Sequence, residues 1–202
     1  MGSVSLQVLP ATAERFDDVS AMLRPRREEA PACWCLYYRL GSSEFNAVRD
    51  RAGLVRELCG GEYAPGVLAY DDGGVVGWCA LGPRADMGRL QRSRTIPAVD
   101  DRPVWSVVCF VVRAGHRRKG VASAMLDGAI EYAQSCGAVA LEGYPVDAEG
   151  ARINVSSAYV GTVSMFEKAG FRRVLKTESR SGNMARWIMR LELQDQTAEG
   201  GG

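Results

Sequence analysis

The sequence predicts a single α/β domain built on one mixed sheet with helices packed against it. Apolar segments of strand character alternate with segments of helical spacing, in the order strand, helices, three strands, helix, strand, helix, two strands. One pair of apolar segments is joined by a turn of aspartates and glycines, which is typical of a hairpin. The chain has 202 residues, enough for one domain with a proper core, and we see no linker that divides it.

The composition is that of an ordinary soluble globular protein. Apolar residues make up 47% and charged residues 24% of the chain, and the formal net charge is +1. Because no global field indicates nucleic acid or a membrane, any anion site must be a local patch. No apolar run approaches the ~20 residues of a membrane span. The first residues lack a secretory signal, and Leu6 stands where a myristoylation motif needs Ser or Thr, so we expect a cytoplasmic protein.

The N-terminal third predicts one strand and two helices. Residues 4–9 alternate between apolar and polar, which predicts a strand, and residues 11–23 have helical spacing. Residues 25–46 are aromatic and irregular. Residues 45–59 form a second helical candidate, which two glycines end.

A hairpin and a central strand follow. The hairpin covers residues 66–84, and its two apolar strands flank the turn Asp71-Asp72-Gly73-Gly74. Residues 84–103 are a polar loop. Residues 104–112, VWSVVCFVV, are nearly all apolar, so we expect a central strand that is covered on both faces.

The C-terminal half alternates helix and strand. Gly170 is a good helix stop. We expect the domain to span residues 1–194 and the tail, residues 195–202, to be disordered. The predicted elements are a helix over 121–136, a strand over 138–146, a helix over 158–169, and strands over 171–177 and 185–193.

The six cysteines are scattered, and we interpret them as buried free thiols in a reducing compartment. Only Cys33 and Cys35 are close in sequence, and their spacing is not that of a zinc ribbon or a thioredoxin-like site. The chain has one histidine, His116. We therefore expect no metal site.

A cluster of positive charge lies between the central strand and the next helix. Residues 113–119 include three arginines, one lysine and the single histidine, and Gly120 follows. The free N–H groups and the dipole of a helix start attract anions, and a glycine lets a ligand approach the backbone. A diphosphate fits this pattern, but Val121 stands where a P-loop needs lysine. The alternative is a solvated basic helix start that binds no ligand.

Three features together resemble the GNAT superfamily of acyl-CoA-dependent N-acetyltransferases. Arg117, Gly120 and Ala122 match the family's pyrophosphate loop, Q/R-x-x-G-x-G/A, which follows a central strand and opens a helix. Residues 165–171, MFEKAGF, are similar to the family's helix that closes before Gly-Phe, and the hairpin is similar to its second and third strands. The resemblance covers most of residues 4–193. It implies a mostly antiparallel sheet of about seven strands, splayed between strands 4 and 5 and flanked by helices.

The resemblance implies acetyl-CoA as co-substrate, with no metal. In the family, the pantetheine arm lies in the gap between the splayed strands and bonds to the backbone of the fourth, while the pyrophosphate lies on the helix start. Carried over to this sequence, the cofactor-binding residues are Phe110, Val111, Val112, Arg117, Arg118, Lys119, Gly120, Val121 and Ala122.

The resemblance also implies that a neutral amine attacks the thioester directly, without a covalent enzyme intermediate. Backbone N–H near Val112 would stabilise the developing oxyanion. An amine with a pKa near 10 is only about a thousandth neutral at pH 7, so a base helps. The candidates near the expected cleft are Glu142 and Tyr144, on one face of the fifth strand, and Asp147 just beyond it. Glu142 is the first candidate for this base and Asp147 the second. Either carboxylate could instead hold a cationic substrate or be an ordinary surface charge.

One position departs from the family pattern. Phe166 stands where many members have a tyrosine that protonates the departing thiolate, and phenylalanine cannot donate a proton. Tyr159 lies two helical turns earlier on a similar face and is the candidate donor. Ser164 and water are alternatives, and Tyr159 could also simply pack the helix onto the sheet.

The substrate pocket is expected from the least regular segments. Trp34, Tyr37 and Tyr38 are the candidates from the aromatic segment, with Tyr144 from the fifth strand and Arg84 from the polar loop. An aromatic wall suits a flat or apolar amine better than a long peptide groove, although the same residues could form a buried aromatic cluster. We therefore expect a primary amine of a small molecule as the acceptor.

Three other functions stay open on the sequence alone. One is acetylation of protein lysines, and another is a CoA-binding module that has lost catalysis with the tyrosine absent at Phe166. The third is a nucleic-acid binder that uses residues 117–119 with Arg172, Arg173 and Lys176, which the near-neutral net charge disfavours. We expect neither a nucleic acid nor a membrane as partner, and a homodimer is possible.

Overall fold

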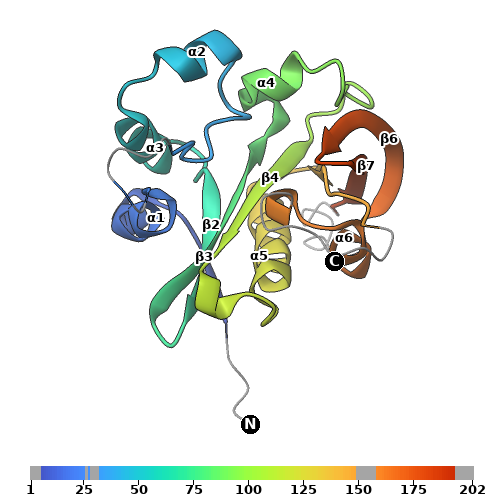
Figure 1. The fold of residues 1–202 in the computed structure, drawn as a ribbon. Coiled ribbons are helices and arrows are strands. Elements are labelled where there is room, and N and C mark those ends of the chain that lie inside the picture. The colour runs from blue at the N-terminus through green and yellow to red at the C-terminus, as the bar shows by residue number, and fades with distance from the viewer. Residues whose placement is uncertain (1–5, 26, 28–31, 149–157, 194–202) are drawn as a thin grey trace, which may run out of the picture.

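In the part of the chain that the structure describes, seven strands form one sheet (Figure 1). The computed structural model describes residues 6–25, 27, 32–148 and 158–193. Of the strands in this part of the chain, only β4 and β5 pair in parallel, and the sheet order is β1-β2-β3-β4-β5-β7-β6. This mixed, mostly antiparallel sheet confirms the predicted fold class. The strands are β1 Gln7–Pro10, β2 Gly66–Asp71, β3 Gly74–Pro83, β4 Trp105–Val112, β5 Ala140–Gly143, β6 Arg172–Ser181 and β7 Met184–Glu192.

Helices cover both faces of the sheet. The helices α1 (Phe16–Leu23) and α3 (Arg51–Cys59) lie on one face, and α5 (Val121–Ser135) and α6 (Val163–Lys168) lie on the other (Figure 1). Each face therefore closes its own hydrophobic core. The shorter helical elements are η1 Ala13–Arg15, α2 Ser42–Ala47, η2 Arg84–Asp86, α4 Gly88–Gln91, η3 Ala114–His116 and η4 Ala158–Val160.

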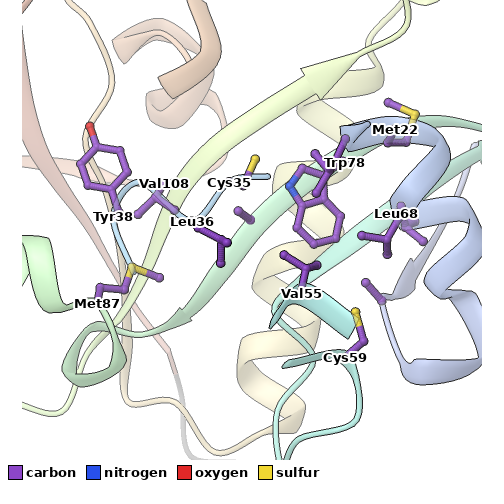
Figure 2. Packing of buried hydrophobic residues seen from close by; sticks show 14 of the residues in the cluster. Met22, Cys35, Leu36, Tyr38, Val55, Cys59, Leu68, Trp78, Met87 and Val108 are labelled. Carbon is purple, nitrogen blue, oxygen red and sulfur yellow. The ribbon is translucent and has the colours of Figure 1, made fainter. Parts of the chain in front are cut away.

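Trp78 of β3 lies at the centre of the first core. Figure 2 shows its indole packed among side chains that include Met22 of α1, Val55 of α3 and Cys35. Trp78 is 1% exposed, so nearly all of its large apolar surface is removed from water. This burial fixes the irregular segment around Cys35 against the sheet, next to the candidate site.

The second core depends on the helical spacing of α5. Val121, Met125, Ala129 and Ala133 recur along one face of this helix, and all four are buried against the sheet. A Cβ at Gly77 of β3 would collide with the Val121 and Met125 side chains. The glycine therefore lets the first turn of α5 pack closely on the sheet, beside the end of β4.

The strand β4 leaves β5 after three residues. Its pairs with β5 run from Trp105 with Leu141 to Val107 with Gly143. At that point β4 also has a bulge, because Val108 is an extra residue relative to β3. In the described part of the chain, β5 has no partner residue for positions 108–112 of β4. The predicted splay between the fourth and fifth strands is thus present, and it leaves an open backbone edge.

The second predicted helix, over residues 45–59, is wrong in its extent. The structure has α2 and α3 in its place, separated by an extended residue at Val48 (ψ 117°). The Asp50 carboxylate accepts a hydrogen bond from the Gly53 N–H at 2.7 Å and so caps a new helix start. The polar loop over 84–103 also contains two short helical elements, η2 and α4.

The helix predicted over residues 158–169 is also divided in two. Gly161 has a left-handed backbone (φ 78°), which separates η4 from α6. The Thr162 hydroxyl then accepts from the Met165 N–H at 3.2 Å and caps α6. The break turns η4 towards β4, and this places Tyr159 at the candidate site.

The described ranges contain no helix that has the length and apolar character to cross a bilayer. The predicted tail at 195–202 lies outside the described residues. The same is true of the first two residues, 4 and 5, of the first predicted strand.

Candidate active site

The turn between β4 and α5 has the backbone shape of an anion-binding loop. Arg118 (φ 61°) and Gly120 (φ 81°) both have a left-handed backbone, and Gly120 is the N-cap of α5. The first N–H groups of an α-helix have no intrahelical partner. Among the described residues, no side chain caps this helix start in their place. A Cβ built at Gly120 would meet no atom within 4 Å, so the space over the helix start is open. The turn can therefore present N–H groups to an anion.

This loop carries positive charge and makes two contacts with the β2–β3 hairpin. The side chains at positions 117–119 are exposed cations. The N–H of Arg113 donates to the Val76 carbonyl at 3.0 Å, and the His116 Nδ1 lies 3.1 Å from the Asp71 carboxylate in the hairpin turn. The loop is therefore tied to the β2–β3 hairpin while its cations face solvent.

The open edge of β4 begins beside this loop. Phe110 is buried and packs edge-on against Phe166, with ring centroids 6.3 Å apart. Val111 and Val112 are half-buried and pack on opposite faces of the sheet. The three side chains thus hold the strand in place, and the backbone on the side that β5 has left can bond to an extended ligand.

A cavity of about 400 Å³ lies among residues of the start of α2, α4 and the β6–β7 hairpin. Its walls come from segments 37–42 and 89–96, from Tyr159 of η4 and from the β6–β7 hairpin. Tyr37 and Tyr38 line it, as predicted for substrate contact, whereas the described lining includes neither Trp34 nor Tyr144. The size is within the range of small-molecule sites.

Tyr159 connects the cavity to β4. It lines the cavity, and its ring packs on the core beside the Cys109 side chain of β4. Burial, the adjacent Tyr38 and the nearby Cys109 raise the pKa of Tyr159 well above its ordinary value of 10.0. The phenol therefore stays protonated at neutral pH and has a proton to donate.

Glu142 lies in a buried ion pair and not free in the cavity. It is 1% exposed, and its Oε1 accepts from the Arg190 Nη2 at 2.7 Å and from the Nε at 3.1 Å. Arg190 also donates to Asp100. The hydrogen bond to Asp100 is the largest cause that raises the pKa of this guanidinium, and the interaction with Glu142 raises it further. A carboxylate held in this way is poorly placed to take a proton from a substrate.

Tyr144 connects Glu142 to the wall of the cavity. Its hydroxyl lies 2.7 Å from the Arg84 Nη1, 2.7 Å from the Ser106 Oγ and 3.2 Å from the Glu142 Oε2. Arg84 in turn donates to the carbonyls of Leu90 and Ile96, which line the cavity. Burial and the Glu142 charge raise the pKa of Tyr144. The network therefore supports the cavity wall from behind.

The sequence matches a family model over residues 32–171, and the description of this model is acetyltransferase (GNAT) family. The chain belongs to this family. The match confirms the resemblance drawn from Arg117, Gly120, Ala122 and the MFEKAGF segment. A search of curated proteins found no match.

The solved structures that are similar to this GNAT chain share its fold at low sequence identity. One is the mosquito arylalkylamine N-acetyltransferase like 5b, 11% identical, with a TM-score of 0.58 over 94% of this chain and 100% of that chain. Another is the Drosophila melanogaster polyamine N-acetyltransferase, 11% identical, with a TM-score of 0.53 over 94% and 100%. A third is a putative acetyltransferase from Salmonella typhimurium with its cofactor acetyl-CoA, 16% identical, with a TM-score of 0.54 over 96% and 97%.

Phe166 is a core residue in this GNAT chain. It is 0% exposed, and its ring packs edge-on against Phe110 and Phe171. A Cβ at Gly143 of β5 would collide with the Phe166 ring, so the two positions fit each other. The ring thus fills the space under the splayed strands, where it has no proton to offer.

Asp147, the second candidate base, accepts hydrogen bonds from Arg173 and Trp187. Its Oδ2 accepts from the Arg173 Nη1 at 3.0 Å and from the Trp187 Nε1 at 3.1 Å. The described lining of the cavity does not include it. Through Arg173 and Trp187, Asp147 is bonded to both strands of the β6–β7 hairpin.

Sequence reasoning missed the arginines that surround the site. Arg89 and Arg186 line the cavity, and Arg190 pairs with Glu142. Arg186 and Arg190 stand in a strand of alternating character, where an inward arginine is unusual. The signal in the sequence is that Arg186 and Arg190 stand four residues apart in one predicted strand, which places both side chains on the same face of the sheet.

The six cysteines are free thiols, of which Cys35, Cys59 and Cys79 are buried and Cys33 is exposed. The Sγ atoms of Cys35 and Cys109 lie 3.2 Å apart without a disulfide. Burial is the main cause that raises the pKa of the Cys59 thiol to about 11. The described residues include no group of three His, Cys, Asp or Glu side chains that could hold a metal ion.

Proposed function

We propose that this GNAT chain transfers an acetyl group from acetyl-CoA directly to the primary amine of a small molecule. The observation that supports this most strongly is the position of Tyr159, which lines the cavity and packs on the same core as Cys109 and Val111 of β4. An acceptor in the cavity would lie beside an acyl donor stretched along the open edge of β4. The volume of about 400 Å³ is within the range of small-molecule sites, which supports a small molecule as the acceptor.

The residues present fit acetyl-CoA, which would supply an activated thioester carbonyl. The N–H groups from Arg118 to Ala122 would hold the pyrophosphate over the open space at Gly120. The backbone of Phe110, Val111 and Val112 would hold the pantetheine arm as an added strand. A free N–H of β4 near Val112 would donate to the carbonyl oxygen as negative charge develops on it.

We propose that Glu142 positions the cavity wall and that water takes the amine proton. Among the described residues, no carboxylate and no imidazole lines the cavity. Glu142 and Asp147 are both held by cationic donors. Proton transfer to a water in the cavity needs no side-chain base.

Tyr159 is our proposed donor of the proton that the leaving thiolate takes up. Tyr159→Phe should lower kcat by roughly 100-fold, because the phenol is the protonated group that lines the cavity beside β4. Steady-state kinetics of thiol release would measure this, and the affinity for acetyl-CoA should stay within about threefold. A suitable control is Tyr70→Phe, which removes a phenol bonded to Asp18 on the first core. Equal kcat for Tyr159→Phe and the wild type would contradict the assignment.

The pH dependence should carry the same signature. The pKa of Tyr159 is raised, so the protonated phenol persists through neutral pH and is lost only as the pH rises through the raised value, above 10.0. The wild-type kcat should therefore show no alkaline loss from this group below about pH 10. A fall in kcat near neutral pH that disappears in Tyr159→Phe would contradict this prediction.

Calorimetry and a thiol-release assay test the function as a whole. Acetyl-CoA should bind, NAD and ATP should not, and free thiol should appear when a panel of primary amines is added. Binding of acetyl-CoA without thiol release from any amine would favour the inactive CoA-binding module. Acetylation of a lysine peptide panel in preference to every small amine would favour a protein acceptor. Failure to bind acetyl-CoA would overturn the proposal.

A further inference from the structure

The cavity wall is strongly cationic. Four arginines line it, Arg89, Arg92, Arg180 and Arg186, and its described lining contains no aspartate or glutamate. Among the described residues, only Arg92 of these four has a carboxylate partner, Glu44 at 3.6 Å. The chain as a whole has a net charge of only +1, so this is a local concentration of positive charge. A cleft that is lined by charges of one sign concentrates ligands of the opposite sign.

Arg186 is the most buried of these arginines, and its partners are neutral. It is 3% exposed, its Nε donates to the Tyr144 carbonyl at 2.9 Å, and its Nη1 donates to the Tyr38 hydroxyl at 2.8 Å. Its Nη2 is buried and has no hydrogen-bond partner among the residues that the structure describes. Among the described residues, no carboxylate lies within 4.0 Å of this guanidinium. A buried cation in this state lacks the counter-ion that usually offsets the loss of water.

The other buried arginines of the same region do have counter-ions. Arg190 pairs with Glu142 and Asp100, and the Arg84 Nη1 lies 4.0 Å from the Glu142 Oε2. Both lie behind the cavity wall, whereas Arg186 faces into the lining. These carboxylates therefore pair with the supporting arginines, whereas Arg186 has no carboxylate partner among the described residues.

Two further lining arginines, Arg89 and Arg180, resemble Arg186 in having neutral hydrogen-bond partners. Arg89 donates to the Tyr37 carbonyl at 2.6 Å and to the Ser42 hydroxyl at 2.9 Å, and Arg180 donates to the Asn183 carbonyl at 3.2 Å. In the described part of the chain, neither has a carboxylate within 4.0 Å. These bonds fix the direction of the guanidinium groups without cancelling their charge.

We infer that the acceptor amine carries an oxyanion, a carboxylate or a phosphate, and that Arg186 with Arg89 and Arg180 binds it. This inference rests on the proposed function and names the substrate class of the same site. A guanidinium presents paired N–H donors that match both kinds of oxyanion. The expected acceptor is therefore an amino acid or an aminophosphate, in place of the flat or apolar amine that the aromatic residues suggested.

The same charges explain how the reaction could proceed although, among the described residues, no carboxylate or imidazole lines the cavity to act as a base. An ammonium group close to several guanidinium groups is disfavoured, which lowers the pKa of the amine and increases its neutral fraction. The oxyanion of the substrate compensates for this repulsion during binding. The cavity can thus select the acceptor by its acid group and favour the neutral form of its amine.

The test compares matched amines that differ in the acid group. The pairs are L-phenylalanine with phenethylamine, L-lysine with cadaverine, and phosphoethanolamine with ethanolamine, each assayed by thiol release from acetyl-CoA with the full chain. In at least one pair, the acid-bearing amine should have a kcat/KM about 100-fold above its neutral partner. The first two pairs report on a carboxylate and the third on a phosphate. A neutral partner that is equal or better in every pair would overturn the inference.

Variants then assign the preference to the arginines. Arg186→Gln should reduce the preference for the acid-bearing amine to less than about tenfold while changing the neutral partner little. Because Arg186 also holds Tyr38 and Tyr144, the exposed Arg180→Gln provides a second variant that removes a charge with one neutral contact. Arg94→Gln is the matched control, since Arg94 is exposed in the same segment but outside the described lining. An undiminished preference in both lining variants would also overturn the inference.

Calorimetry with bound CoA separates this inference from the proposed function. Unreactive CoA replaces acetyl-CoA, and each pair of amines is titrated into the complex. Binding of an acid-bearing amine but not of its neutral partner supports the anion site, even if no thiol is released in the kinetic assay. Thiol release that prefers neutral amines overturns the inference and leaves the proposed function standing. If no acid-bearing amine binds or reacts, the anion site is wrong.

Discussion

Gly120→Glu should weaken acetyl-CoA binding by at least about 100-fold while the fold survives. The Cβ of a glutamate at position 120 would point into open space over the start of α5, so its carboxylate would enter the region where we place the pyrophosphate. Two like charges about 4 Å apart repel by roughly 4 kcal/mol near a protein surface, and each 1.4 kcal/mol is a factor of about ten in affinity. Calorimetric titration with acetyl-CoA measures the loss.

The opposite end of the same helix provides a matched control. Gly137 follows α5, has a left-handed backbone (φ 75°) and would also place a Cβ in open space. Both glutamate variants therefore carry the same charge change and a similar backbone strain of about 1–2 kcal/mol. Gly137→Glu should bind acetyl-CoA as the wild type does. If the two folded variants bind acetyl-CoA with equal affinity, the assignment of the pyrophosphate to this loop is wrong.

The anion loop could be predicted because its determinants are local. A strand that ends, a run of cations, a glycine and a small residue within ten positions specify both the turn and the exposed helix start. The hairpin was equally local, since its turn residues stand between two apolar runs. Helix boundaries were less reliable, because the cap at Asp50 and the break at Gly161 compete with continuous helical spacing.

The charges around the cavity could not be predicted in the same way, because they depend on strand register. Glu142 lies opposite Ser106 on one neighbouring strand and opposite Arg190 on the other. A shift of one residue would turn Glu142 to the other face of the sheet and break the pair. The sequence identified Glu142 as a carboxylate near the cleft, but its partner lies on a strand that comes much later in the chain. A candidate base therefore proved to be half of a buried ion pair.

Arg190→Met should lower the free energy of unfolding by roughly 3–5 kcal/mol, the largest stability effect that we expect in this chain. The side chains of Arg190 and Glu142 are 8% and 1% exposed, and the variant would leave Glu142 buried with Tyr144 at 3.2 Å and Arg84 at 4.0 Å. A buried carboxylate that loses its main counter-ion keeps the cost of dehydration without the attraction that offset it. Denaturant unfolding measures the change, and the melting temperature should fall by about 2–4 °C per kcal/mol.

The matched control is Arg102→Met, which breaks an ion pair of similar geometry at the surface. Arg102 donates to Glu192 at 2.7 and 3.0 Å, but the two side chains are 43% and 63% exposed, so water replaces the lost partner and stability should change little. Adding Glu142→Gln to Arg190→Met should recover part of the loss, because it removes the uncompensated charge. A similar loss in Arg190→Met and Arg102→Met, or no recovery in the double variant, would mean that burial of the charge is not what makes this pair important.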